Sequence, residues 1–72
     1  MKNEERYKKL SVNVFYWRKK RGLTQKELAE KAGVSVYVLR NIERSDTKGN
    51  ASIISLFNIA DALVVEASEL IL

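Results

Sequence analysis

The residue types that most often carry out chemistry in proteins are scarce in this chain of 72 residues. It contains no histidine and no cysteine, so the commonest general base, the thiolate nucleophile and the commonest zinc ligands are absent. The nine carboxylates stand mostly at helical-surface spacings beside lysines, which is typical of solvated surfaces. We therefore expect no catalytic site, no metal and no cofactor. The chemistry that remains is that of charge and hydrogen bonding.

The basic side chains are unevenly distributed along the chain. Residues 1–49 carry all 13 lysines and arginines and six of the acids, a balance of +7. Residues 50–72 carry three acids and no base, a balance of −3. A polyanion would be attracted to the first two-thirds and repelled by the last third, unless the division is only charge scatter in a short chain.

The length of the chain permits one domain, over residues 1–72, with one modest core. A core of this size stabilises a fold by only about 3–5 kcal/mol, and small domains often gain stability by dimerising. No apolar run approaches the roughly 18 residues that span a bilayer, and the N-terminus is too polar for a signal peptide. We therefore expect a soluble, cytoplasmic protein.

Apolar residues recur at steps of three and four, which predicts an all-α fold with no strand. Helices are expected over residues 4–20, 25–32, 36–44, 53–63 and 67–71, and a loop over 45–51. Connections this short predict a five-helix orthogonal bundle. The residues expected to face its core are Tyr7, Leu10, Val14, Trp17, Leu28, Ala29, Ala32, Leu39, Ile42, Ile53, Leu56, Ile59, Ala60, Leu63 and Leu70.

The clearest local signals lie at the ends of the two central helices. Thr24 and Glu27, three residues apart, form a capping box that begins a helix. Gly33 suits the left-handed turn that ends this helix, and Ser35 can cap the next one only two residues later. Two short helices joined by so tight a turn allow the second to stand out from the body. Such a helix fits a DNA major groove, which is about 12 Å wide.

Residues 22–35 (Gly-Leu-Thr-Gln-Lys-Glu-Leu-Ala-Glu-Lys-Ala-Gly-Val-Ser) and 42–44 (Ile-Glu-Arg) resemble the Cro/C1-type (XRE-like) helix-turn-helix family of phage repressors and bacterial regulators. Residues 59–63 are similar to the family's fourth helix. The resemblance implies a lambda-repressor-like fold and sequence-specific binding of double-stranded DNA. It further implies a transcriptional repressor or regulator of bacterial or phage type, associated with the nucleoid. Val64 stands where many members have a glycine that ends a helix.

The resemblance also implies roles for individual positions. Gln25 matches the family's phosphate-binding glutamine, and the helix N-terminus at which it stands independently favours an anion. Gln25 could instead be only a good helix former. Arg18 and Glu43 match a structural ion pair of the family. Further candidates for binding DNA phosphates are Thr24, Ser35, Arg44, Lys48 and the basic cluster 19–21. Not all of these bases need reach the DNA, and Lys19 and Lys20 could instead be solvated charges.

Base-reading contacts are expected from the outer face of the helix over 36–44, namely from Val36, Tyr37, Arg40 and Asn41. Arg40 can bond both O6 and N7 of guanine, Asn41 can pair with adenine, and Val36 can contact a thymine methyl group. Alternatively, Tyr37 and Val38 pack on a neighbouring element, so that only Arg40 and Asn41 face the bases. Relatives that begin this helix with glutamines differ here, so their target sites do not transfer.

One recognition helix reads few base pairs, so regulators of this shape generally bind palindromic operators as two-fold dimers, with half-site centres about 34 Å apart. We expect a homodimer through the last two helices. That region carries no positive charge and holds more apolar side chains than the core needs: Ile54, Phe57, Val64, Val65, Ile71 and Leu72. These side chains could instead close a small core or abut a missing domain.

Two other functions remain open from the sequence. The first is a protein-binding adaptor on the same fold, whose third helix would be uncharged or acidic. Arg40, Arg44 and the basic balance of residues 1–49 argue against it. The second is a DNA-binding fragment of a larger regulator.

Overall fold

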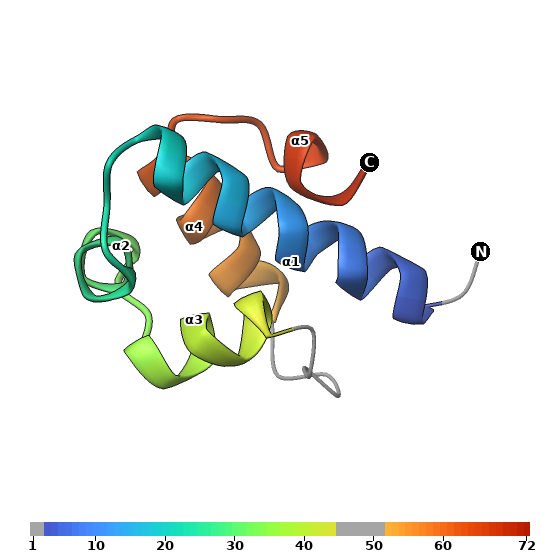
Figure 1. Ribbon diagram of the computed structural model, residues 1–72, viewed down its shortest axis with the longest axis horizontal. Coiled ribbons are helices and arrows are strands. Elements are labelled where there is room, and N and C mark those ends of the chain that lie inside the picture. Colours follow the sequence, from blue (N-terminus) through green and yellow to red (C-terminus); the bar gives the residue numbers. More distant parts are fainter. Residues whose placement is uncertain (1–2, 45–51) are drawn as a thin grey trace.

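The computed structural model describes residues 3–44 and 52–72. These residues form five helices and no strand (Figure 1): α1 Asn3–Lys20, α2 Gln25–Ala32, α3 Val36–Glu43, α4 Ile53–Leu63 and α5 Ser68–Ile71. The all-α fold with five helices is therefore confirmed. The loop predicted over 45–51 lies outside the described residues.

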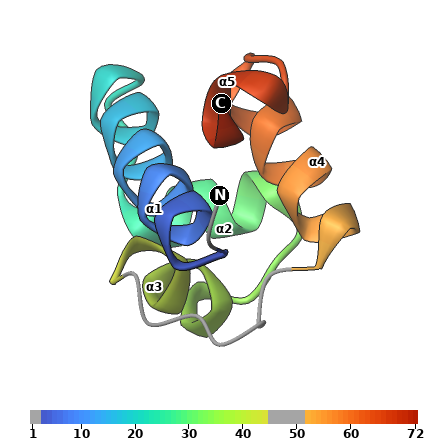
Figure 2. The ribbon, with the colours of Figure 1, turned by 90° about the vertical axis from the view of Figure 1, so that its right-hand side faces the viewer.

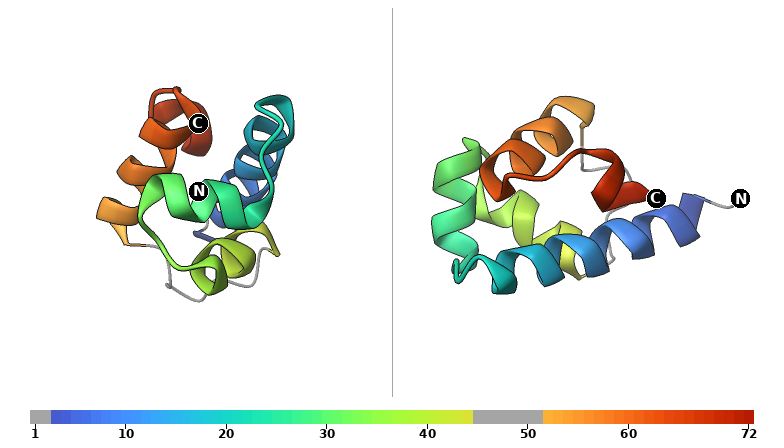
Figure 3. Two further views of the ribbon diagram at one scale, coloured as in Figure 1. Left: turned by 90° about the vertical axis from the view of Figure 1, so that its left-hand side faces the viewer. Right: turned by 90° about the horizontal axis from the view of Figure 1, so that it is seen from above.

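The helices cross one another instead of running parallel. Figure 2 shows α1 and α4 on opposite sides of the molecule, with α2 crossing between them and α3 lying beneath. α2 packs on both α4 and α3, and α1 packs on α3 and α5. Two further views in Figure 3 show α5 returning beside α1 after the end of α4. The result is an orthogonal bundle in which α2 and α3 form one corner.

Every helix contributes aliphatic side chains to a single core. The buried apolar residues are Leu10, Val14, Leu28, Ala29, Ala32, Leu39, Ile42, Ile59, Ala60, Leu63 and Leu70, all of which were predicted to face inward. Tyr7, Trp17 and Leu56 are partly buried against this core. The prediction for Ile53 is wrong, because its side chain is 67% exposed. Ile53 is the first residue of α4 and lies before Leu56, where the helix begins to pack on the core.

Local hydrogen bonds set the ends of α2 and α3. The Oγ1 atom of Thr24 accepts from the Glu27 backbone N–H at 3.0 Å, and the Thr24 backbone N–H donates to Glu27 Oε1 at 2.8 Å. The capping box is thus confirmed, and the hydrogen bond from the Thr24 backbone N–H, followed by the Thr24 side chain, lowers the pKa of the Glu27 carboxyl group. Gly33 ends α2 at a φ of 71°. Ser35 Oγ then accepts from the Val38 backbone N–H at 3.0 Å and so caps α3.

Polar side chains of α1 join this helix to the rest of the bundle. The buried hydroxyl of Ser11 donates to the carbonyl oxygen of Ile42 in the last turn of α3. Asn13 Nδ2 donates to the Leu70 carbonyl oxygen of α5 at 2.9 Å. Because each bond satisfies a polar group inside the fold, α1 holds the end of α3 and the short α5 in fixed positions.

The end of α4 carries a strained residue. Val64 follows α4 with a φ of 60°, and it is the one non-glycine residue with positive φ among residues 3–44 and 52–72. A left-handed conformation is unfavourable for a β-branched side chain and costs roughly 1–2 kcal/mol. A glycine at this position would avoid that cost, because glycine adopts a positive φ without strain.

We expect Val64→Gly to raise the free energy of unfolding by about 0.5–1 kcal/mol, as relief of strain exceeds the added entropy of the unfolded chain. The Val64 side chain is exposed, so little burial is lost. Urea denaturation measures the change. The control Asp61→Gly, at an exposed position within α4, should lower stability by roughly 0.3 kcal/mol, because glycine is a somewhat poorer helix former than aspartate. An equal loss in both variants would mean that Val64 is not strained.

Candidate nucleic-acid interface

α2 and α3 form a helix-turn-helix. The turn between them is closed by a hydrogen bond of 3.0 Å from the Val34 backbone N–H to the Ala29 carbonyl oxygen. Ala29 is buried in the core, so a larger side chain here would have to displace its neighbours. α3 has eight residues and is therefore about 12 Å long. An α-helix with its side chains is about 10–12 Å across, so α3 fits a major groove about 12 Å wide.

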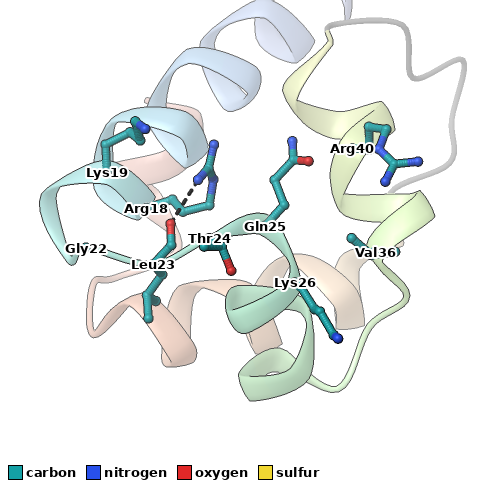
Figure 4. Close-up of a pocket in the computed structure, with 9 residues that line it drawn as sticks. All are labelled: Arg18, Lys19, Gly22, Leu23, Thr24, Gln25, Lys26, Val36 and Arg40. Atoms are coloured by element: carbon teal, nitrogen blue, oxygen red, sulfur yellow. Dashed lines mark hydrogen bonds between the residues drawn. The ribbon is translucent and has the colours of Figure 1, made fainter.

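A groove of about 640 Å³ lies beside this pair of helices. Figure 4 shows its walls: Arg18 and Lys19 at the end of α1, residues 22–26 at the start of α2, and Val36 and Arg40 on α3. Among residues 3–44 and 52–72, no acidic side chain lines it. The N-terminus of α2 opens here, and the unsatisfied N–H groups of a helix N-terminus attract anions.

Arg18 and Glu43 make a two-pronged ion pair between α1 and the last residue of α3. Arg18 Nε donates to Glu43 Oε2 at 2.6 Å, and Nη2 donates to Oε1 at 2.9 Å. Arg18 Nη1 also donates to the Leu23 carbonyl oxygen at 2.9 Å. The two side chains are only 9% and 5% exposed. The charge of Arg18 is thus paired with Glu43 inside the fold, although Arg18 also lines the groove.

The predicted phosphate-binding residues lie in different settings. Thr24 and Ser35 are exposed, and each hydroxyl accepts a capping hydrogen bond, which leaves its own proton available to an external acceptor. Gln25 is partly buried, and its Nε2 atom donates to Glu43 Oε1 at 3.1 Å. Arg44 is exposed at the end of α3. Lys48 lies outside the described residues.

Arg21, in the predicted basic cluster 19–21, contacts both α4 and α1. Its Nε donates to the Leu63 carbonyl oxygen at 2.7 Å, and its guanidinium lies 5.0 Å from the centre of the Trp17 ring. Arg21 therefore satisfies an otherwise unpaired carbonyl at the end of α4. Sequence alone gave no sign of this contact, because the two residues are 42 positions apart.

The predicted base-reading residues of α3 also separate into two groups. Tyr37 is 66% exposed, Arg40 is exposed, and Val36 is half-buried at the edge of the groove. Asn41 is only 8% exposed, so its expected pairing with adenine is not retained. It lies one turn after Val38, on the side of α3 that turns inward. The alternative, in which Tyr37 and Val38 pack on a neighbouring element, is correct for Val38, which packs on the core, and wrong for Tyr37.

The arrangement of α2, α3 and the groove defines a helix-turn-helix domain, and the family match agrees with it. Residues 14–70 match the helix-turn-helix family HTH_3, the Cro/C1-type (XRE) family, and the chain belongs to this family. Membership implies DNA binding and a lambda-repressor-like fold, in a family that is not enzymatic. No curated protein matches the chain. Within residues 3–44 and 52–72, no helix has both the length and the hydropathy needed to cross a bilayer.

Proposed function

We propose that this protein regulates transcription, as a repressor or related regulator, by binding a specific double-stranded DNA site with α3 in the major groove. The observation that carries the proposal is the exposed Arg40 on α3, facing the same groove as the N-terminus of α2. Arg40, which can contact bases, and the N-terminus of α2, which can bind the DNA backbone, can therefore reach the same duplex. Phosphate contacts fix the register, and α3 supplies the sequence preference.

The contacts divide between two parts of the DNA. Arg40 forms a two-pronged hydrogen bond with guanine, Val36 contacts a thymine methyl group, and Tyr37 reaches a neighbouring base. The phosphates are bound by Gln25, the hydroxyls of Thr24 and Ser35, and the exposed cations Arg44, Lys19 and Lys26. Lys48, outside the described residues, remains a further candidate from the sequence.

Arg40→Ala is expected to cost about 1–3 kcal/mol of binding free energy and to relax the preference at one base pair. Gln25→Ala should weaken binding to all sequences about equally, because phosphate contacts carry no sequence information. Both effects are measured by competition among duplexes in which each position of a selected site is changed in turn. If both variants lost affinity uniformly across that set, α3 would not be the reading helix.

We also propose that two copies pair through an apolar surface on the first half of α4. This α4 patch consists of Ile53, Ile54 and Phe57, whose side chains are 67%, 69% and 53% exposed. Clustered apolar exposure of this kind favours a protein interface. The patch carries no charge and does not line the groove.

Of the other expected interface residues, Val64 and Leu72 are exposed, whereas Val65 and Ile71 pack on the core.

Phe57→Glu is expected to convert the dimer to a folded monomer, because burying a phenylalanine contributes about 1.5–3 kcal/mol and a buried charge opposes pairing. Sedimentation at micromolar concentration measures the change, and circular dichroism checks the fold. The control Tyr16→Glu alters an equally exposed aromatic on α1 and should remain dimeric. A wild-type chain that is monomeric at this concentration, and binds two half-sites without cooperativity, would contradict the dimer.

A further inference from the structure

One carboxylate joins the three helices that surround the groove. Glu43 is the last residue of α3, Arg18 is near the end of α1, and Gln25 is the first residue of α2. The Oε1 atom of Glu43 accepts from Arg18 Nη2 at 2.9 Å and from Gln25 Nε2 at 3.1 Å. The ion pair alone would need only Arg18, so the contact with Gln25 calls for a separate explanation.

We propose that Glu43 is a positioning residue, which orients the side-chain amide of Gln25 for a DNA phosphate. This inference rests on the proposed DNA-binding function. A glutamine amide has two N–H donors, of which Glu43 takes one, and the other is left for a phosphate oxygen. A free glutamine loses rotamer entropy when it binds, whereas one already held in place loses less. Glu43 therefore raises affinity without touching the DNA.

The pairing with Arg18 makes this arrangement compatible with DNA. A bare carboxylate beside the Gln25 amide would repel an approaching phosphate. Arg18 donates two hydrogen bonds to that carboxylate, so the pair carries no net charge toward the groove. Arg18 thus neutralises the group that positions Gln25, and it does not itself count among the cations that neutralise DNA phosphates.

A double-mutant cycle tests the inference. One background keeps the ion pair, and the other carries Arg18→Met with Glu43→Leu, since apolar replacement of a buried pair often leaves stability unchanged. Gln25→Ala is made in each background. The probe is a duplex of mixed sequence at low salt, because phosphate contacts do not depend on sequence. Fluorescence anisotropy gives Kd, and thermal unfolding verifies each fold.

With the ion pair intact, Gln25→Ala should weaken binding about 3- to 10-fold, the value of one hydrogen bond. With the pair replaced, the same change should weaken binding by less than about 2-fold, since Gln25 is no longer held. The salt slope should stay the same on Gln25→Ala, because glutamine carries no charge.

Each other outcome overturns a separate statement. An equal loss in both backgrounds would give Glu43 a structural role alone. If Gln25→Ala left Kd unchanged in both backgrounds while duplex binding was retained, Gln25 would not contact the DNA, and this inference would be overturned. No duplex binding by the unaltered chain would instead overturn the proposed function. Should the double replacement unfold, NMR relaxation of the Gln25 side-chain amide in the unaltered protein decides. An order parameter as high as that of rigid backbone, about 0.85, is expected, and one below about 0.6 would overturn the inference.

Discussion

Arg18→Met is expected to lower the free energy of unfolding by about 3–5 kcal/mol, the usual effect of removing one partner from a buried ion pair. Glu43, whose side chain is 5% exposed, would keep its charge without a cation beside it. The Leu23 carbonyl oxygen would also lose its donor. A domain of this size has roughly 3–5 kcal/mol of stability in total. A large fraction of the Arg18→Met molecules should therefore be unfolded at room temperature.

Circular dichroism during urea titration measures this loss. The matched control is Lys19→Met, which removes a positive charge from the adjacent, exposed position and should change stability by less than about 0.5 kcal/mol. Combining Arg18→Met with Glu43→Leu should recover most of the loss, because neither partner then remains charged and unpaired. If Arg18→Met behaved like Lys19→Met, the pair would not hold α1 to α3.

Leu39→Ala is the second change with a large expected effect. Leu39 is fully buried in α3, and its removal leaves a cavity that costs about 2–5 kcal/mol. The control Tyr37→Ala stands two residues earlier in the same helix, with 66% of the residue exposed, and should cost less than about 0.5 kcal/mol. Thermal unfolding compares the two. Similar melting temperatures would mean that α3 is not anchored through Leu39.

The parts of the fold that could be predicted from sequence are those set by neighbouring residues. Thr24 and Glu27 are three positions apart, so their reciprocal hydrogen bonds need only the helix that they begin. The core positions of α2 and α3 follow from helical spacing in the same way. Ile53 fits that spacing equally well but lies outside the core, because spacing shows the face of a helix and not how far its neighbours extend.

The site needed the arrangement of the helices in space. Lys19 and Arg21 are both basic residues near the end of α1, yet Arg21 donates to a carbonyl of α4 and Lys19 lines the groove. Asn41 and Arg40 are adjacent polar residues, but only Arg40 is exposed. The contact of Gln25 with Glu43 spans 18 positions. No local pattern predicts which of two similar residues a distant helix will cover.

The most direct test of the claim that α3 reads DNA sequence is a binding selection from duplexes of random sequence at physiological salt. If α3 reads sequence in a dimer, one short sequence should be enriched, present as two inverted halves whose centres lie about 34 Å apart. Guanine should occupy a fixed position in each half, opposite Arg40. A folded protein that retained duplexes with no enriched sequence, or retained none, would contradict the account.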